Sequence, residues 1–245
     1  MEWQADMSFA AYCLADADEL WQRYARHEWI ESLALGSLTD ERFAFFHRYD
    51  VAYSADMHRA LAVGVAKAPT GCDWARAALR VLYESFILDK QQRKQRLLTR
   101  LGLPPTVPLA RAARGLSRDA YANHVLRVGW EQPTGVLAAA LLPCAMFTEI
   151  IGARFATDPP ATRPEITEWV KGYVNECDAD MTRRHAELMD EHALVAGSEG
   201  RRAMRAEFRR SVEYQTRVFD AAMSLDDDIV TTGGDKPADP TRSIR

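Results

Sequence analysis

The sequence is short of the residues that would build a disulfide framework or a structural zinc site. Its 245 residues include four cysteines, and no two of them form a Cys-x-x-Cys pair: Cys13, Cys72, Cys144 and Cys177. Such scattered cysteines exclude a small disulfide- or zinc-stapled domain. The 47% hydrophobic content is enough for one substantial core or two small ones. We therefore expect free thiols in a cytoplasmic protein.

Signals for export, membrane insertion and nucleic-acid binding are missing as well. The N-terminus has no basic start followed by an apolar core, and no uninterrupted apolar run approaches the roughly 20 residues that cross a bilayer. The formal net charge of −4 argues against a nucleic-acid binder, which normally has a basic face. The densest basic stretch, residues 90–100, is interpreted as a solvated helix face. We expect neither nucleic-acid nor membrane partners.

β-strand signals are equally scarce, and the helical period takes their place. No run alternates apolar and polar residues with β-branched enrichment, and no Asn-Gly hairpin signal is present. Apolar residues instead recur at three- and four-residue steps. Helices are predicted over about 8–26, 28–35, 72–100, 117–130, 134–156, 164–194 and 198–224, with a further helix beginning after Thr39 as its cap. The segment 164–194 is expected to bend or break between Cys177 and Asp180.

The domain organisation follows from where this periodicity stops. From Asp226 onward the chain loses its apolar spacing and gains Gly, Pro and Asp. Such a composition does not bury enough apolar surface to fold. We therefore predict one all-α domain over residues 1–225 and a mobile tail over residues 226–245.

The stretch LLPCAMFTEIIG places Cys144 directly after a proline inside an apolar helix. Pro143 has no N–H to donate to the Ala139 carbonyl, and its ring crowds that carbonyl, so the helix should bend there. One interpretation is a helix curved around the core with a cysteine that only packs. The other is a nucleophile, which needs a lowered pKa or a nearby base. Taken alone, these two residues favour packing.

Asp50 is a second candidate, because it lies on an otherwise apolar helix face. Phe43, Phe46, Asp50, Tyr53 and Met57 follow each other at three- and four-residue steps. A buried carboxylate must be paired or hydrogen-bonded. Beside an aromatic wall it suits a flat ring with N–H donors. It suits equally well a structural bond to a buried Arg, Tyr or backbone group, and the sequence leaves the two readings level.

The histidines do not predict a metal site. His185 and His192 are seven residues apart, and Asp190 lies five residues after His185, roughly on the opposite helix face. His27 is interpreted as a structural histidine at a helix junction. No metal and no cofactor are predicted. Tyr121 and Tyr173, taken singly, are interpreted as core residues.

Four segments together resemble the TenA/thiaminase II family, which has the haem-oxygenase-like all-helical fold. They read LWQRYARHEWIESLALGSLTDERFAFFHRYDVAY, HRALAVGVAKAP, LAAALLPCAMFTEIIG and AEFRRSVEYQTRVFDAA. They occur in the family's order and span roughly residues 8–223. The resemblance implies a TenA-like helical bundle that assembles as a homo-oligomer, typically a tetramer.

The resemblance also implies an activity and a set of roles. Family enzymes hydrolyse a C–N bond at the pyrimidine methylene carbon of thiamin breakdown products, for pyrimidine salvage. By position, Asp50 would recognise the aminopyrimidine ring and Cys144 would be the nucleophile. Tyr53, Tyr121 and, less securely, Tyr173 would be pocket aromatics. The partner is thus a small molecule with an aminopyrimidine-like ring.

Several pocket positions depart from the family pattern. Gln215 stands where the family has a Glu that relays protons, and an amide cannot take or give a proton. Thr148 replaces a tyrosine, Val218 replaces a phenylalanine, and Tyr49 replaces a glutamine. These changes predict a larger or differently shaped pocket, an altered substrate and reduced activity.

Three functions are therefore weighed. The first is a TenA-like hydrolase with Cys144 as nucleophile, which we favour, and the second is a binding protein that kept the pocket but lost full catalysis. The third is the metal-dependent oxidase branch of the same fold. Glu84 matches one expected ligand there, but Gln91 stands where a histidine is needed. No basic recognition helix supports a regulator that binds DNA.

Overall fold

The computed structural model describes residues 3–86, 96–97, 99–100, 102, 115–157, 164–174 and 178–226. The predicted tail lies outside these ranges apart from Asp226. Cys177, Gln91 and the part of the predicted helix 72–100 that covers residues 87–95 also lie outside them.

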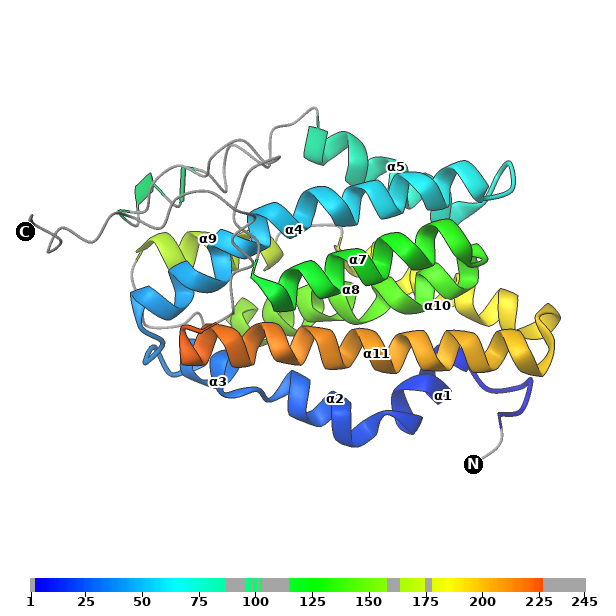
Figure 1. The fold of residues 1–245 in the computed structure, drawn as a ribbon, viewed down its shortest axis with the longest axis horizontal. Coiled ribbons are helices and arrows are strands. Elements are labelled where there is room, and N and C mark those ends of the chain that lie inside the picture. Colours follow the sequence, from blue (N-terminus) through cyan, green and yellow to red (C-terminus); the bar gives the residue numbers. More distant parts are fainter. Residues whose placement is uncertain are drawn as a thin grey trace, which may run out of the picture.

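The described elements are all α-helices (Figure 1). In chain order they are α1 (Phe9–Asp16), α2 (Asp18–Ala25), α3 (Glu28–Ala34), α4 (Asp40–Lys67), α5 (Asp73–Phe86), α7 (Leu116–Glu131), α8 (Thr134–Thr157), α9 (Pro164–Val174), α10 (Asp178–Val195) and α11 (Gly197–Ser224). The long helices α4, α7, α8, α10 and α11 run along the long axis of the molecule, and α1 to α3 lie beside α11 (Figure 1).

The predicted helix boundaries hold where a capping residue marks them. Thr39 caps α4, its side chain accepting a hydrogen bond from the Arg42 amide. The predicted helix 8–26 divides at Ala17 into α1 and α2. The backbone N–H of Ala17 donates to the carbonyls of Cys13 and Leu14, which ends α1. In the segment 164–194, α9 ends at Val174 and α10 begins at Asp178, and the residues between them lie outside the described ranges, so the expected bend or break stays a prediction.

Helix α8 is the central element of the bundle. It packs against α7, α9, α10 and α11, and its residues 136–143 are all buried. The segment Thr134–Phe155, with a mean hydropathy of 1.9, is long and apolar enough to cross a membrane by length and composition, which the sequence analysis did not expect. About 61% of that segment is buried inside the protein. A core helix surrounded by four others has the same composition, because every face of it is apolar.

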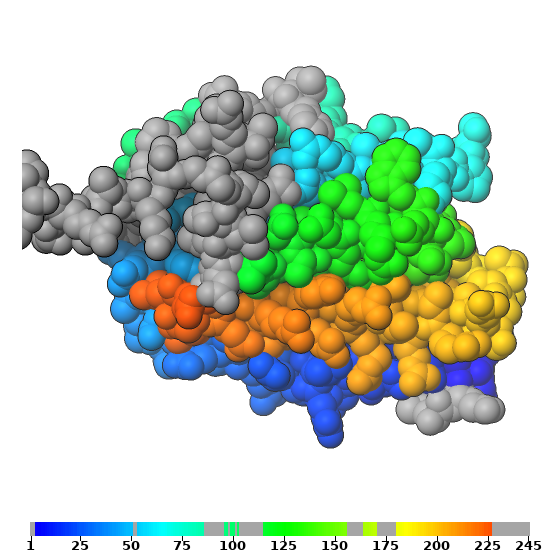
Figure 2. Space-filling model, in the orientation of Figure 1, coloured from blue at the N-terminus to red at the C-terminus, as the bar shows by residue number. Residues whose placement is uncertain are grey.

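Helices from distant parts of the sequence lie side by side and shape the interior. Helix α7 packs against α4 and α11, and the three cross the face shown in Figure 2 in the order α4, α7, α11. Aromatic rings from α2, α3, α4 and α11 meet near the Phe147 ring, which lies near the middle of α8: Tyr24, Trp29, Phe46 and Phe219. This packing fixes the position of the residues around Cys144.

Candidate functional site

Side chains from four helices meet around Cys144. Asp50 and Tyr53 come from α4, Tyr121 from α7 and Gln215 from α11, and the electrostatic environment of the Cys144 thiol includes Asp50, Tyr53 and Gln215. Tyr121 lies against both Tyr53 and Gln215. Five predicted site residues that are widely separated in the sequence therefore form one cluster: Asp50, Tyr53, Tyr121, Cys144 and Gln215.

Asp50 is paired with an arginine that the sequence analysis did not single out. Arg118 Nη2 donates to Asp50 Oδ1 at 3.1 Å, with side-chain exposures of 4% and 14%. The guanidinium carbon lies 4.8 Å from the centre of the Phe46 ring and 5.1 Å from that of Tyr53. Cation–π contacts and the ion pair together hold the charge in the protein interior. Asp50 therefore forms the bond to a buried arginine that was one of the two interpretations of this carboxylate.

The Arg118 side chain keeps one donor unused. Its Nε is buried and has no hydrogen-bond partner among the described residues. Arg118 and Tyr121 are three residues apart on α7, so both face α4. The spacing was visible in the sequence, but an arginine at an i, i+3 position of a helix is usually solvated, and nothing local indicated its burial.

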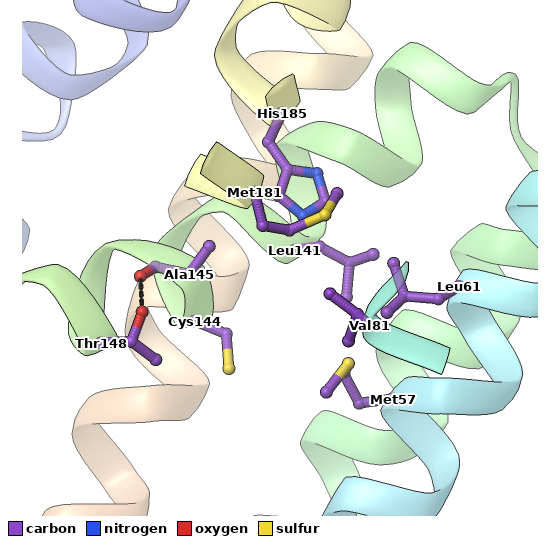
Figure 3. A pocket seen from close by; sticks show the side chains of 9 residues that line it. All are labelled: Met57, Leu61, Val81, Leu141, Cys144, Ala145, Thr148, Met181 and His185. Carbon is purple, nitrogen blue, oxygen red and sulfur yellow. Dashed lines mark hydrogen bonds between the residues drawn. The ribbon is translucent and has the colours of Figure 1, made fainter. Parts of the chain in front are cut away.

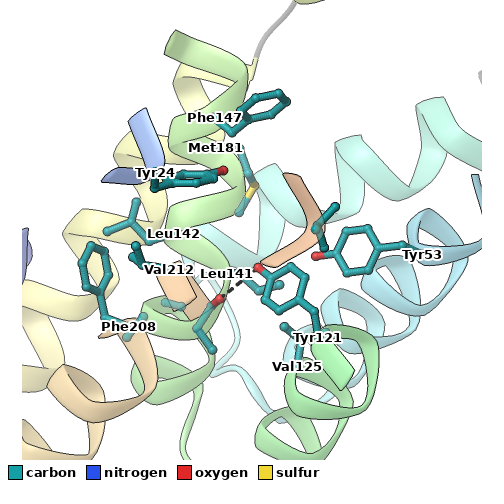
Figure 4. Packing of buried hydrophobic residues seen from close by; sticks show 14 of the residues in the cluster. Tyr24, Tyr53, Tyr121, Val125, Leu141, Leu142, Phe147, Met181, Phe208 and Val212 are labelled. Carbon is teal, nitrogen blue, oxygen red and sulfur yellow. Dashed lines mark hydrogen bonds between the residues drawn. The ribbon is translucent and has the colours of Figure 1, made fainter. Parts of the chain in front are cut away.

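Tyr53 and Tyr121 stack on each other. Their ring centres are 5.0 Å apart with planes inclined by 16°, and Figure 4 shows the two rings side by side in the core. The Tyr121 hydroxyl donates to the Ala140 carbonyl at 3.4 Å. The Tyr53 hydroxyl is buried and lacks a well-formed hydrogen bond among the described residues. Burial raises the pKa of both phenols, so both are protonated donors at neutral pH.

Cys144 is a thiol rather than a thiolate at neutral pH. Burial raises its pKa, and the negative charge of Asp50 raises it further. The adjacent Tyr53 and Gln215 side chains and the positive charge of Arg118 oppose that rise. An attack by sulfur therefore requires that the proton leave during the reaction.

Cys144 also lines a cavity with about 450 Å³ of empty space, part of which is open to solvent (Figure 3). The cavity lies between α4, α5, α8 and α10. Its walls are Met57, Leu61, Val81, Leu141, Cys144, Ala145, Thr148, Met181 and His185. Most are apolar, as in a small-molecule site. Met57 follows Tyr53 by one helical turn on α4, so the cavity continues along the face that carries Asp50 and Tyr53.

The remaining predicted residues take different positions. Thr148 lines the cavity, with its hydroxyl donating to the Ala145 carbonyl at 2.6 Å. Val218 is buried in the core, outside the cavity wall. Tyr173 lies in α9, and its side chain is outside the described part of the structure. Tyr49 is buried with its ring edge-on to Phe45.

The histidines take separate structural partners. His27 Nδ1 accepts from the Trp29 amide at the start of α3, which is the junction role predicted for it. His185 accepts from Trp74, Asp190 accepts from Ser8 and Ala10, and His192 contacts Thr134. His185, Asp190 and His192 therefore do not converge, as predicted. Within the described ranges, no group of three His, Cys, Asp or Glu side chains is placed to hold a metal ion.

Comparisons with known proteins agree with this fold. The chain matches the sequence profile of the TENA/THI-4/PQQC family over residues 14–225. It is 24% identical over 220 residues to an aminopyrimidine aminohydrolase of Halalkalibacterium halodurans, covering 88% of this chain and 96% of that one. It is 21% identical over 223 residues to an aminopyrimidine aminohydrolase of Helicobacter pylori, covering 88% and 99%.

A solved structure gives the same result in three dimensions. The TenA homologue protein from P. horikoshii OT3 superimposes with a TM-score of 0.75 at 20% identity, covering 89% of this chain and 99% of that chain. The all-α, TenA-like fold predicted from the sequence is confirmed by this superposition.

Proposed function

Because the chain belongs to the TENA/THI-4/PQQC family, we propose that it is a hydrolase that cleaves the C–N bond at the methylene carbon attached to an aminopyrimidine ring. The observation that carries the proposal is the position of Cys144. Its thiol lies in the wall of an apolar cavity, beside Asp50, Tyr53 and Gln215. The two aminopyrimidine aminohydrolases to which the chain is similar support the same reaction class.

The proposed reaction has two displacement steps. Cys144 Sγ attacks the methylene carbon, the C–N bond breaks, and the thiol proton ends on the departing amine. Water then attacks the same carbon, the C–S bond breaks, and the water's protons end on the new hydroxymethyl oxygen and on the restored thiol. The sum is one water consumed, with one alcohol and one amine released.

The site lacks a carboxylate beside Cys144 at the position of Gln215 that could carry out the proton transfers. Gln215 stands beside Cys144 and Tyr121 but cannot accept or donate a proton as a carboxylate does. A positioned acid or base contributes about 10²–10⁴-fold to rate. We therefore expect slow turnover of simple aminopyrimidines, with proton transfer left to water or to the ion-paired Asp50.

Arg118 changes how Asp50 would recognise a ring. One carboxylate oxygen already accepts from the guanidinium at 3.1 Å. An aminopyrimidine that binds Asp50 must share the carboxylate with Arg118, and the stacked Tyr53 and Tyr121 leave no gap for a ring between them. Weaker binding of the standard ring and an altered substrate follow from this arrangement.

The second candidate is a binding protein on the same fold. Gln215 and the raised pKa of Cys144 favour it, because both remove catalytic power while leaving the cavity intact. The two candidates differ in whether a bound aminopyrimidine is turned over.

The test is binding and turnover of 4-amino-5-aminomethyl-2-methylpyrimidine and thiamin by wild type, Gln215→Glu and Cys144→Ser. We expect slow wild-type hydrolysis, a gain of about 10²-fold or more in Gln215→Glu, and loss of turnover in Cys144→Ser with unchanged circular dichroism. Glu213→Gln, on the exposed side of α11, is the control for the charge change. Cys72→Ser is the control for loss of a thiol.

Each other outcome has a definite meaning. Retained activity in Cys144→Ser would exclude it as the nucleophile. Binding without wild-type turnover, with activity gained in Gln215→Glu, would identify a binding protein. Neither binding nor turnover would refute the aminopyrimidine proposal. Assembly as a homotetramer and a cytoplasmic location stay predictions.

A further inference from the structure

His185 is a buried histidine that the cluster around Cys144 does not use. It lies on α10 with 2% of its surface exposed, and it is the polar ring in the wall of the cavity (Figure 3). Cys144 and Thr148 lie in the same wall, on α8. A histidine in an otherwise apolar cavity needs a hydrogen-bond partner for each ring nitrogen.

One ring nitrogen has its partner within the protein. Trp74 Nε1 donates to His185 Nδ1 at 3.0 Å, and an indole nitrogen is always a donor. Nδ1 must therefore be the acceptor, and the proton of the neutral imidazole lies on Nε2. Burial lowers the pKa of His185 to about 3, so the ring is neutral over the physiological range.

The Nε2–H group has no hydrogen-bond partner among the described residues, and the ring borders the cavity. The side chains that surround it there are Met57, Leu61, Val81, Leu141 and Met181. None of these accepts a strong hydrogen bond, and none of the nine wall residues is charged at neutral pH. A bound molecule is the natural acceptor for this donor.

We propose that His185 is a specificity-determining residue, whose Nε2–H donates to an uncharged acceptor, such as an ether, carbonyl or ring nitrogen, on an otherwise apolar leaving group. The assignment of this space to the leaving group rests on the proposed function. Cys144 borders the cavity and also senses the charge of Asp50, which would hold the ring. A carbon attacked by sulfur would therefore have the ring on one side and the departing amine on the other.

The absence of charged side chains among the nine wall residues disfavours an ionic leaving group. A neutral imidazole in an apolar wall does not offset the cost of desolvating a carboxylate or phosphate. The empty space of about 450 Å³, part of it open to solvent, exceeds what ammonia requires and lets a larger apolar group extend along the wall. The expected substrate is an aminopyrimidine whose amine carries an apolar chain or ring with one acceptor.

The test uses probes that cannot be cleaved, so that binding is measured independently of hydrolysis. They are 4-amino-2-methylpyrimidines with a 5-hexyl chain and a series in which one chain methylene at a time is replaced by an ether oxygen. Isothermal titration calorimetry compares wild type, His185→Leu and His185→Gln. His58→Leu is the matched control, because His58 is also buried and its Nε2 bonds to Ser85 outside the cavity wall.

We expect at least one ether to bind wild type about 3- to 10-fold more tightly, relative to hexyl, than it binds His185→Leu. His185→Gln should restore part of the difference, and His58→Leu should keep all of it. A nitrogen-resolved NMR spectrum should show His185 protonated on Nε2 and shifted by the ether probe.

An unchanged ether-to-hexyl ratio in His185→Leu would overturn the inference. Hydrolysis of the parent 4-amino-5-aminomethyl-2-methylpyrimidine without binding of any probe would also overturn it, while leaving the proposed function standing. Failure of both the probes and the parent would refute the proposed function and this inference with it. Tight probe binding that depends on His185, without any hydrolysis, would support the donor role in a binding protein.

Discussion

The pairing of Arg118 with Asp50 predicts a large energetic coupling between two residues that are 68 positions apart. The pair has 4% and 14% side-chain exposure and an N–O distance of 3.1 Å. Replacing Arg118 by Met leaves a carboxylate without its cation. Replacing Asp50 by Asn leaves a buried guanidinium whose Nε already lacks a partner. Making both changes removes both charges at once.

The magnitude follows from the geometry. Two unit charges at 3.1 Å attract by about 5 kcal/mol at an effective dielectric constant of 20, before desolvation is subtracted. Breaking a buried pair by removing one partner costs about 3–5 kcal/mol, whereas removing both is often close to neutral. Loss of the contacts with Phe46 and Tyr53 adds about 1 kcal/mol whenever Arg118 is absent. We expect each single variant to lose about 3 kcal/mol and the double variant about 1 kcal/mol, so the coupling is about 5 kcal/mol.

Urea unfolding of wild type, Arg118→Met, Asp50→Asn and the double variant measures this coupling. The control cycle uses Arg127 and Glu131, an exposed pair on α7 with an N–O distance of 3.2 Å, for which we expect about 0.3–0.5 kcal/mol. Additive losses in the Arg118 cycle, with a coupling no larger than that of the control, would refute the buried pair.

Two further predictions concern stability. Burial lowers the pKa of His124 to about 4 and of His185 to about 3, so the stability that each contributes as a neutral ring is present above pH 6.5 and is lost as the pH falls toward the folded-state pKa. Unfolding midpoints in urea should fall by the equivalent of about 2 kcal/mol per histidine between pH 7.5 and 5, and an unchanged pH slope in His185→Gln would contradict the assignment. Gly135→Ala should destabilise the protein by about 1–3 kcal/mol, because its Cβ would lie 2.5 Å from His192 Cβ. Gly129→Ala is the control, since its Cβ meets atoms at 3.7 Å and helix propensity favours Ala by about 1 kcal/mol, so equal losses in thermal unfolding of the two variants would refute the packing argument.

Most of the fold could be predicted from local signals. Thr39 caps α4, Pro164 begins α9, and the helical period runs through α4, because capping, proline geometry and periodicity act within a few residues. The division at Ala17 was missed, since the residues on both sides of it favour helix and only packing decides where the axis turns.

The site could be predicted only in part. The resemblance assigned roles to Asp50, Tyr53, Tyr121, Cys144 and Gln215, and in the tertiary structure these residues come together. Their roles in the reaction stay predictions. The partner of Asp50 could not be predicted, because it depends on α7 packing against α4 rather than on any pattern near residue 50.

The helical class, the caps and the residue types at the pocket positions, including the amide of Gln215 in place of a carboxylate, can be read from the amino-acid sequence. The pairing of Arg118 with Asp50, the stacking of Tyr53 on Tyr121 and the extension of the cavity from Cys144 to His185 depend on the packing of the helices. The two groups of features differ because the interactions act over different ranges along the chain. Capping and periodicity are local along the chain, whereas ion pairs, ring stacking and cavities depend on which helices meet.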